Sequence, residues 1–125
     1  MNIILTLPNT NINCRVERLN IALGTARGIQ FLHAQTPTVF HGDIKSGNIL
    51  LDKHLEPKIA DFGLSRSSSK DHITMTMRSV IGTPVYTPSE YLQSGILDYT
   101  VDVHCYGVTM FDLVSGILFS PFSIT

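Results

Sequence analysis

Tryptophan is absent from this sequence of 125 residues, cysteine occurs only twice and the net charge is −1. Nine Lys and Arg stand against ten Asp and Glu, so the basic excess typical of nucleic-acid-binding proteins is missing. Cys14 and Cys105 lie far apart, and neither has a second Cys or a His at the spacing of a zinc site. The cysteines therefore support neither a disulfide framework nor a metal or redox protein, and they favour a reducing compartment.

Long hydrophobic runs are missing as well, and none approaches the ~20 residues of a membrane span. The apolar start at Met1 to Leu7 has no basic region before it and reaches Pro8 too soon for a signal peptide. We therefore expect no membrane insertion. A hydrophobic content of 43% indicates an ordered chain that can bury one core but is too short for two sizeable domains.

An amphipathic helix is predicted over residues 15–33, where apolar residues recur at three- and four-residue steps. These residues are Leu19, Ala22, Leu23, Ala26 and Ile29. Gly24 and Gly28 lower the helix propensity, so we expect the close approach of a neighbouring backbone to hold the helix. Residues 1–14 show neither a helical nor a strand period, which predicts an irregular segment.

A second long helix is predicted over residues 102–115, which are apolar nearly all round and therefore belong in the middle of a structure. A short helix is expected over residues 90–94. Residues 48–52 and 57–60 are β-rich runs separated by a polar turn, and this pattern predicts a hairpin.

The residues that carry chemistry are gathered in His41-Gly42-Asp43-Ile44-Lys45-Ser46-Gly47-Asn48 and, just after the hairpin, in Asp61-Phe62-Gly63. Asp43 supplies a carboxylate for a nucleophile's proton, and Lys45 supplies a cation for a phosphate. The hairpin would bring the oxygens of Asn48 and Asp61 to one place, and Mg²⁺ prefers such hard ligands. Singly, Asn48 and Asp61 are also typical turn residues. The four together favour a phosphoryl-transfer site.

With these residues in hand, the chain from about residue 18 to residue 116 resembles the C-terminal lobe of a eukaryotic protein kinase of the tyrosine-kinase-like group. It carries the motifs H-x-D-x-K-x-x-N, D-F-G, G-T-x-x-Y and D-V-x-x-x-G in that order. Residues 24–33 and 41–46 closely resemble the Pelle and interleukin-1-receptor-associated kinases of Toll signalling. The resemblance implies an α+β fold, mainly α, with helices and a short β-hairpin.

The resemblance also implies roles for individual residues. Asp43 would be the base that accepts or orients the acceptor's hydroxyl proton, and Lys45 would stabilise the transferred phosphoryl group of ATP. Asn48 and Asp61 would hold Mg²⁺. Leu50 would form the floor under the adenine.

Further residues would have structural or regulatory roles. An isolated His beside an apolar stretch is usually a packing residue, and the resemblance implies that His41 stacks with Phe62, which precedes Gly63. Thr83, together with Asp43 and Lys45, would point to Ser or Thr rather than Tyr as the acceptor. Asp102 would anchor the catalytic loop, by which we mean residues 41–48.

Residues 65–79 are polar and rich in hydroxyls, which predicts a mobile loop. By resemblance this is an activation loop, with Thr74, Thr76 and Ser79 as candidate phosphorylation sites. Gly42 replaces the Arg of many kinases, a feature shared by Pelle-like members. Glu90 would normally pair with an Arg far downstream, so we expect it to be a costly buried carboxylate.

The sequence contains no Gly-rich loop and no strand with a phosphate-binding Lys, so we expect the N-lobe to be absent. We also expect the last helices of the C-lobe to be absent. The expected organisation is an irregular segment (1–17), a partial kinase domain (18–116) and a divergent tail (117–125). We expect a partial Ser/Thr kinase that is inactive in isolation, is cytoplasmic and is related to receptor-proximal adaptor complexes. The alternative is a non-catalytic scaffold or decoy that binds kinases, substrates or adaptors.

Overall fold

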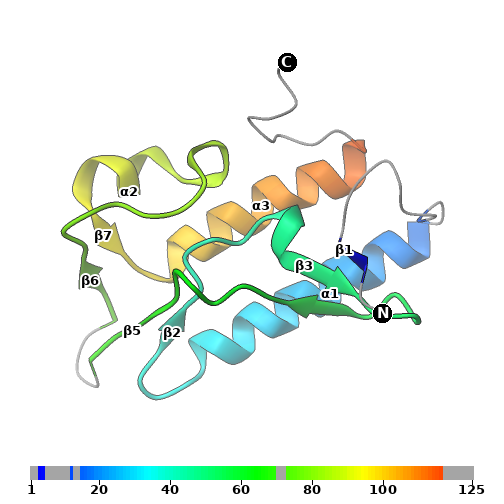
Figure 1. Ribbon diagram of the computed structural model, residues 1–125, viewed down its shortest axis with the longest axis horizontal. Helices are drawn as coiled ribbons and strands as arrows, with labels where there is room; N and C mark the ends of the chain where they lie inside the picture. Colours follow the sequence, from blue (N-terminus) through cyan, green and yellow to red (C-terminus); the bar gives the residue numbers. More distant parts are fainter. Residues whose placement is uncertain (1–2, 5–11, 13–14, 70–72, 117–125) are drawn as a thin grey trace.

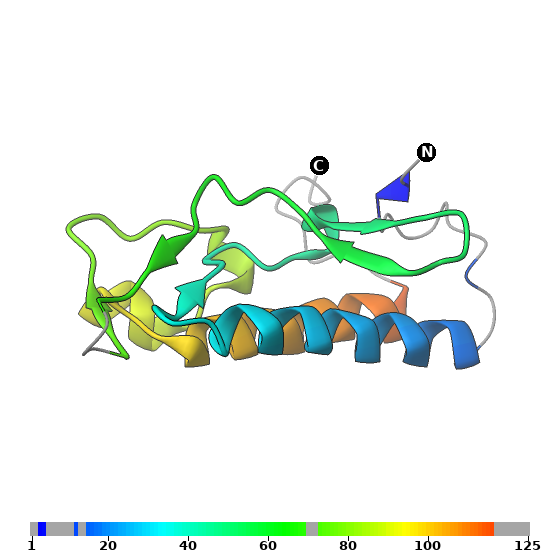
Figure 2. The same ribbon diagram turned by 90° about the horizontal axis from the view of Figure 1, so that it is seen from below.

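Two long helices, α1 (Arg15–His33) and α3 (Tyr99–Ser115), form one layer, and the strands and connecting loops lie on one face of it (Figures 1 and 2). The computed structural model describes residues 3–4, 12, 15–69 and 73–116. The remaining elements, in chain order, are β1 (Ile3–Ile4), β2 (Val39–Phe40), the 3₁₀ turn η1 (Ser46–Asn48), β3 (Ile49–Leu51), β4 (Pro57–Ile59), β5 (Arg66–Ser67), β6 (Met75–Thr76), the 3₁₀ turn η2 (Pro84–Tyr86), α2 (Ser89–Ser94) and β7 (Ile96–Leu97).

The predicted hairpin is confirmed, because β3 and β4 pair antiparallel with Ile49 opposite Ile59. Its turn is closed by Asp52, whose Oδ1 accepts the backbone N–H groups of Glu56 at 3.0 Å and His54 at 2.8 Å. These hydrogen bonds stabilise the charged carboxylate and lower the pKa of Asp52. The hairpin thus has a fixed turn at one end and the catalytic loop at the other.

Two expectations of irregular structure are wrong at a few of their residues. Ile3–Ile4 forms β1, which adds an antiparallel strand to the open edge of β3. Within residues 65–79, β5 pairs with β2 and β6 pairs with β7. All three are two-residue strands whose hydrogen-bond partners lie far away in the sequence, so local periodicity could not reveal them.

Helix α1 has the predicted bounds, but the predicted buried face is wrong at Leu19 and Leu23, which are exposed, while Ala22 and Ala26 are half-buried and Ala22 packs against a core cluster. The buried residues are Ile21, Thr25 and Ile29, whereas Leu19 is 68% exposed. The reason lies in Gly24, where an added Cβ would come within 2.5 Å of Pro57 Cγ, and in Gly28, where it would come within 2.8 Å of Ile59 Cδ1. The glycines therefore turn toward β4 and are approached by its side chains, not by a backbone.

Helix α3 begins at Tyr99, slightly before the predicted start, because Asp98 caps it by accepting the backbone N–H of Thr100 at 2.8 Å. The expectation that this helix is surrounded is wrong within the described residues, since Phe111 is 69% and Val114 is 73% exposed. Helix α2 confirms the predicted short helix. The predicted tail, 117–125, lies outside the described residues. None of the described helices combines the length and hydropathy that crossing a membrane requires.

The buried apolar side chains form two clusters that position the catalytic loop. One cluster contains Ile44 together with Ile29, Phe40, Tyr86, Tyr91, Leu97, Val101 and Cys105. The other contains Ile49 together with Ile12, Ile21, Leu51 and Leu113. Because Ile44 and Ile49 flank the polar residues 45–48, burial at both points fixes this part of the loop between the two clusters.

Candidate active site

The start of the catalytic loop is hydrogen-bonded to a buried carboxylate of α3. Asp102 is fully buried, and its two oxygens accept the backbone N–H groups of His41 and Gly42, each at 2.9 Å. His33, at the end of α1, places its Nε2 2.8 Å from Asp102 Oδ2. Gly42 adopts φ +83°, and a Cβ there would lie 3.0 Å from the carbonyl oxygen of Leu64. The glycine in place of a larger residue is therefore explained by backbone conformation and by space.

His41 is completely buried and both ring nitrogens are engaged. Nε2 lies 2.8 Å from the carbonyl oxygen of Ala60, so it carries the ring proton, while Nδ1 accepts the backbone N–H of Asp43 at 3.1 Å. The Phe62 ring meets the imidazole edge-on at 5.1 Å. The contacts of His41 are those of a packing residue that joins the catalytic loop to the segment after β4.

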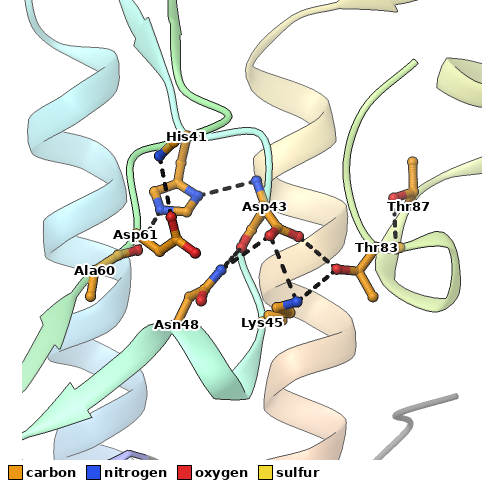
Figure 3. Close-up of polar contacts among 9 residues, drawn as sticks. His41, Asp43, Lys45, Asn48, Ala60, Asp61, Thr83 and Thr87 are labelled. Carbon is orange, nitrogen blue, oxygen red and sulfur yellow. Dashed lines mark hydrogen bonds and ion pairs between the residues drawn. The ribbon is translucent and has the colours of Figure 1, made fainter. Parts of the chain in front are cut away.

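Asp43, Lys45 and Thr83 converge at one point, where their side chains face one another (Figure 3). Thr83 donates its hydroxyl to Asp43 Oδ1 at 2.8 Å and accepts a hydrogen bond from Lys45 Nζ at 2.9 Å. Lys45 Nζ lies 3.7 Å from Asp43 Oδ2. The group unites a carboxylate, an ammonium and a hydroxyl from two segments that are distant in the sequence.

Asn48 closes the same group from η1 (Figure 3). Its amide Nδ2 donates to the carbonyl oxygen of Asp43 at 2.8 Å and to Asp43 Oδ2 at 3.2 Å, which leaves the amide oxygen for another partner. The backbone N–H of Ala60 donates to the carbonyl oxygen of Asn48 at 2.8 Å, so Asp61 follows directly after a residue tied to Asn48.

Asp61 is exposed in a left-handed conformation, φ +57°, and its Oδ1 accepts the backbone N–H of Gly63 at 3.3 Å. Asn48 and Asp61 thus offer an amide oxygen and a carboxylate, a donor set that fits Mg²⁺ when phosphates and water complete the shell. No group of three or more His, Cys, Asp or Glu side chains suited to a metal occurs in the described part of the chain.

Other residues singled out from the sequence lie on β3, in residues 73–79 and on α2. Leu50 is half-buried in β3, opposite Lys58. Thr74, Thr76 and Ser79 are exposed, and Thr76 lies in β6. The expectation that Glu90 is buried is wrong: its side chain is exposed on α2 and therefore keeps its hydration.

The sequence reasoning missed one buried group. Asp112 of α3 is fully buried and accepts a hydrogen bond from Ser46 Oγ at 2.7 Å and another from the Tyr86 hydroxyl. Burial, followed by the hydrogen bond to Asp112, raises the pKa of Tyr86. The available signal was an acidic residue in an otherwise apolar helical stretch, where a carboxylate needs donors nearby.

Comparison with known proteins adds the following similarities. The family model described as the protein kinase domain matches residues 7–123. Interleukin-1 receptor-associated kinase 1 of Mus musculus is 44% identical over 107 residues, which cover 80% of this chain and 15% of the relative. Serine/threonine-protein kinase pelle of Drosophila melanogaster is 44% identical over 102 residues, covering 80% and 20%. Probable serine/threonine-protein kinase PBL21 of Arabidopsis thaliana is 43% identical over 100 residues, covering 79% and 26%. The chain thus matches about a quarter or less of each relative's length.

Proposed function

Because this chain belongs to the protein kinase domain family, we propose that it carries the phosphoryl-transfer residues of a serine/threonine protein kinase, arranged as in the C-terminal lobe. The observation that supports this proposal is the convergence of Asp43, Lys45, Asn48 and Thr83 within hydrogen-bond distance. A structural turn would not require a carboxylate and an ammonium to share one hydroxyl partner.

In this proposal Asp43 orients the acceptor's hydroxyl and takes its proton, because its carboxylate is held in place by Asn48 and Thr83. Lys45, already beside Asp43, stabilises the charge of the phosphoryl group in transfer. Asn48 and Asp61 would hold Mg²⁺, which supplies neutralising charge to the phosphates of ATP when bound. Leu50 would lie under the adenine.

Thr83 supports Ser or Thr as the acceptor, since its hydroxyl already contacts both Asp43 and Lys45. The printed names of two relatives, serine/threonine-protein kinase pelle and probable serine/threonine-protein kinase PBL21, point the same way. From the similarity to interleukin-1 receptor-associated kinase 1 and to pelle, we propose a cytoplasmic role in a Toll or interleukin-1-receptor type pathway, with receptor-proximal adaptors as partners. Phosphorylation at the exposed Thr74, Thr76 or Ser79 would regulate it.

We further propose that the 125-residue chain alone transfers phosphate very slowly or not at all. Its sequence contains no Gly-rich loop to cover the phosphates and exclude water. A non-catalytic scaffold or decoy is therefore the second candidate. It is favoured by apolar side chains exposed beside Thr83 and on α2, where Val85 is 40% and Leu92 is 47% exposed.

The test is calorimetric titration of the full chain with ATP, with and without Mg²⁺. Binding that requires Mg²⁺, disappears in Asp61→Asn and persists in Glu56→Gln would support the proposed function. Glu56 is a suitable control because it is exposed in the hairpin turn and the change removes one negative charge as well. A chain that is folded by circular dichroism but does not bind ATP would overturn the nucleotide role and favour the scaffold.

A further inference from the structure

Helix α3 holds the catalytic loop at two points, and the second point also holds another segment. Asp102 accepts the N–H groups at the start of the loop. Asp112, about three turns further along the helix, accepts the hydroxyl of Ser46 at 2.7 Å and that of Tyr86. We name residues 83–87, which include η2, the acceptor-side segment. Asp112 is thus a single group bonded to both the catalytic loop and the acceptor-side segment.

The residues that carry the two hydroxyls, Tyr86 and Ser46, are each linked by few contacts to the groups proposed to take part in phosphoryl transfer. On one side, Tyr86 donates its backbone N–H to the carbonyl oxygen of Thr83 at 2.9 Å, and Thr83 bonds Asp43 and Lys45. On the other side, Ser46 directly follows Lys45 and begins η1, which ends at Asn48. The four converging side chains are therefore connected to one another by a buried bridge through Asp112.

A carboxylate suits this position because it accepts hydrogen bonds and donates none. Ser46 and Tyr86 are both buried, and each needs an acceptor for its hydroxyl proton. The Tyr86 hydroxyl is protonated at neutral pH at its ordinary pKa of 10.0, and burial raises that pKa further. Both hydroxyls donate to the same oxygen, Oδ2. An amide would place there either a neutral oxygen, which is a weaker acceptor than a carboxylate oxygen, or an N–H₂ group, which accepts neither hydroxyl, and both arrangements weaken the bridge.

We propose that Asp112 is a positioning residue that couples the acceptor-side segment to the catalytic loop and so fixes the place at which an acceptor hydroxyl meets Asp43. This inference rests on the proposed function for its meaning in catalysis. The coupling itself is a property of the folded chain. It therefore requires neither ATP nor a protein acceptor to be measured.

The experiment is NMR on the full chain and on Asp112→Asn, Tyr86→Phe and Ser46→Ala, with Asp98→Asn as the matched control. Asn keeps the helix cap at position 98, so this control removes a charge from the N-cap of α3 without touching the bridge. In Asp112→Asn and Tyr86→Phe we expect amide exchange at Tyr86 and Thr87 to accelerate about tenfold, the effect of losing one hydrogen bond to a charged group. In Ser46→Ala we expect this acceleration at Asn48.

The methyl signal of Thr83 is the reporter of coupling. It should shift in all three bridge variants, Ser46→Ala included, and stay in place in Asp98→Asn. The amides of His41 and Gly42 should keep their protection, because Asp102 holds them independently. Uniform acceleration of exchange at every amide, or an unmoved Thr83 methyl signal in Ser46→Ala, would overturn the proposal and leave a purely structural role.

Tyr86→Phe and Ser46→Ala preserve the test if Asp112→Asn does not fold. Failure of wild-type ATP binding, measured separately, would instead overturn the proposed function.

Discussion

The carboxylate of Asp102 accepts the backbone N–H of His41 at 2.9 Å, although the two residues are 61 positions apart. The same carboxylate accepts the N–H of Gly42 and lies beside His33, and it is fully buried. We predict that Asp102→Asn lowers the free energy of unfolding by about 2–4 kcal/mol, because the amide leaves a buried N–H without its acceptor. Urea denaturation measures the change. Asp98→Asn serves as the control and should cost less than about 0.5 kcal/mol; equal costs would contradict the prediction.

The sequence predicts those parts of the fold that depend on neighbours in the chain. The bounds of α1 follow from its periodicity, and the hairpin follows from two β-rich runs around a turn. Asp43, Lys45 and Asn48 are found by their spacing, because the chemistry needs those side chains within one short loop. Their convergence with Thr83 depends on tertiary packing, which residue types and spacing alone do not reveal.

What the sequence does not predict is decided by distant partners. Ile3–Ile4 becomes a strand only because β3 offers an open edge. The buried face of α1 is set by the approach of β4 to Gly24, which overrides the apolar stripe that contains Leu19. Asp112 tolerates burial because Ser46 and Tyr86 bring hydroxyls to it. In each case the deciding contact joins segments far apart in the sequence.

The glycines of the two long helices should respond in opposite ways to the same substitution. Gly24→Ala should destabilise the fold by about 1–3 kcal/mol, because its Cβ would meet Pro57 Cγ at 2.5 Å and the hairpin would have to shift. Gly107→Ala should stabilise it by about 0.5–1 kcal/mol, because an added Cβ would have no described atom within 4 Å apart from the adjoining residues and the helix's own backbone, and alanine favours a helix. Thermal or urea denaturation of the two variants measures both changes in stability. A Gly24→Ala variant more stable than the wild type would refute the close packing of α1 on β4.

Cys105 should make unfolding dependent on pH above about 9. Burial, followed by the negative charges of Asp102 and Asp43, raises the pKa of the Cys105 thiol from 9.0 to about 12. The unfolded chain then loses the thiol proton at a lower pH than the folded chain, so stability is complete below pH 9 and falls as pH rises toward 12. The slope owed to one proton is about 1.4 kcal/mol per pH unit.

Cys105→Ala should remove the part of the pH dependence that is due to the thiol. The free energy of unfolding that the substitution costs should not vary with pH below about 9. Tyr86 and Tyr106 also have raised pKa values and contribute to the wild-type slope above pH 10. The difference between wild type and Cys105→Ala therefore isolates the thiol, and guanidinium denaturation at several pH values between 8 and 10.5 measures it. Parallel curves for the two proteins would show that the thiol does not titrate as we predict.

Thr83 should owe its stabilising effect to its hydroxyl, which donates to Asp43 at 2.8 Å and accepts from Lys45 at 2.9 Å. Thr83→Val keeps the shape and removes both hydrogen bonds, so we predict a loss of about 1–2 kcal/mol in the free energy of unfolding. Thr83→Ser keeps the hydroxyl and should cost less than about 0.5 kcal/mol.

A double-mutant cycle of Thr83→Val with Asp43→Asn then measures the interaction of the two side chains directly by urea denaturation. Because the two side chains are in contact, the coupling energy should be about 1 kcal/mol. A value near zero would mean that the acceptor-side segment is held against the catalytic loop by other contacts, and that Thr83 does not position Asp43.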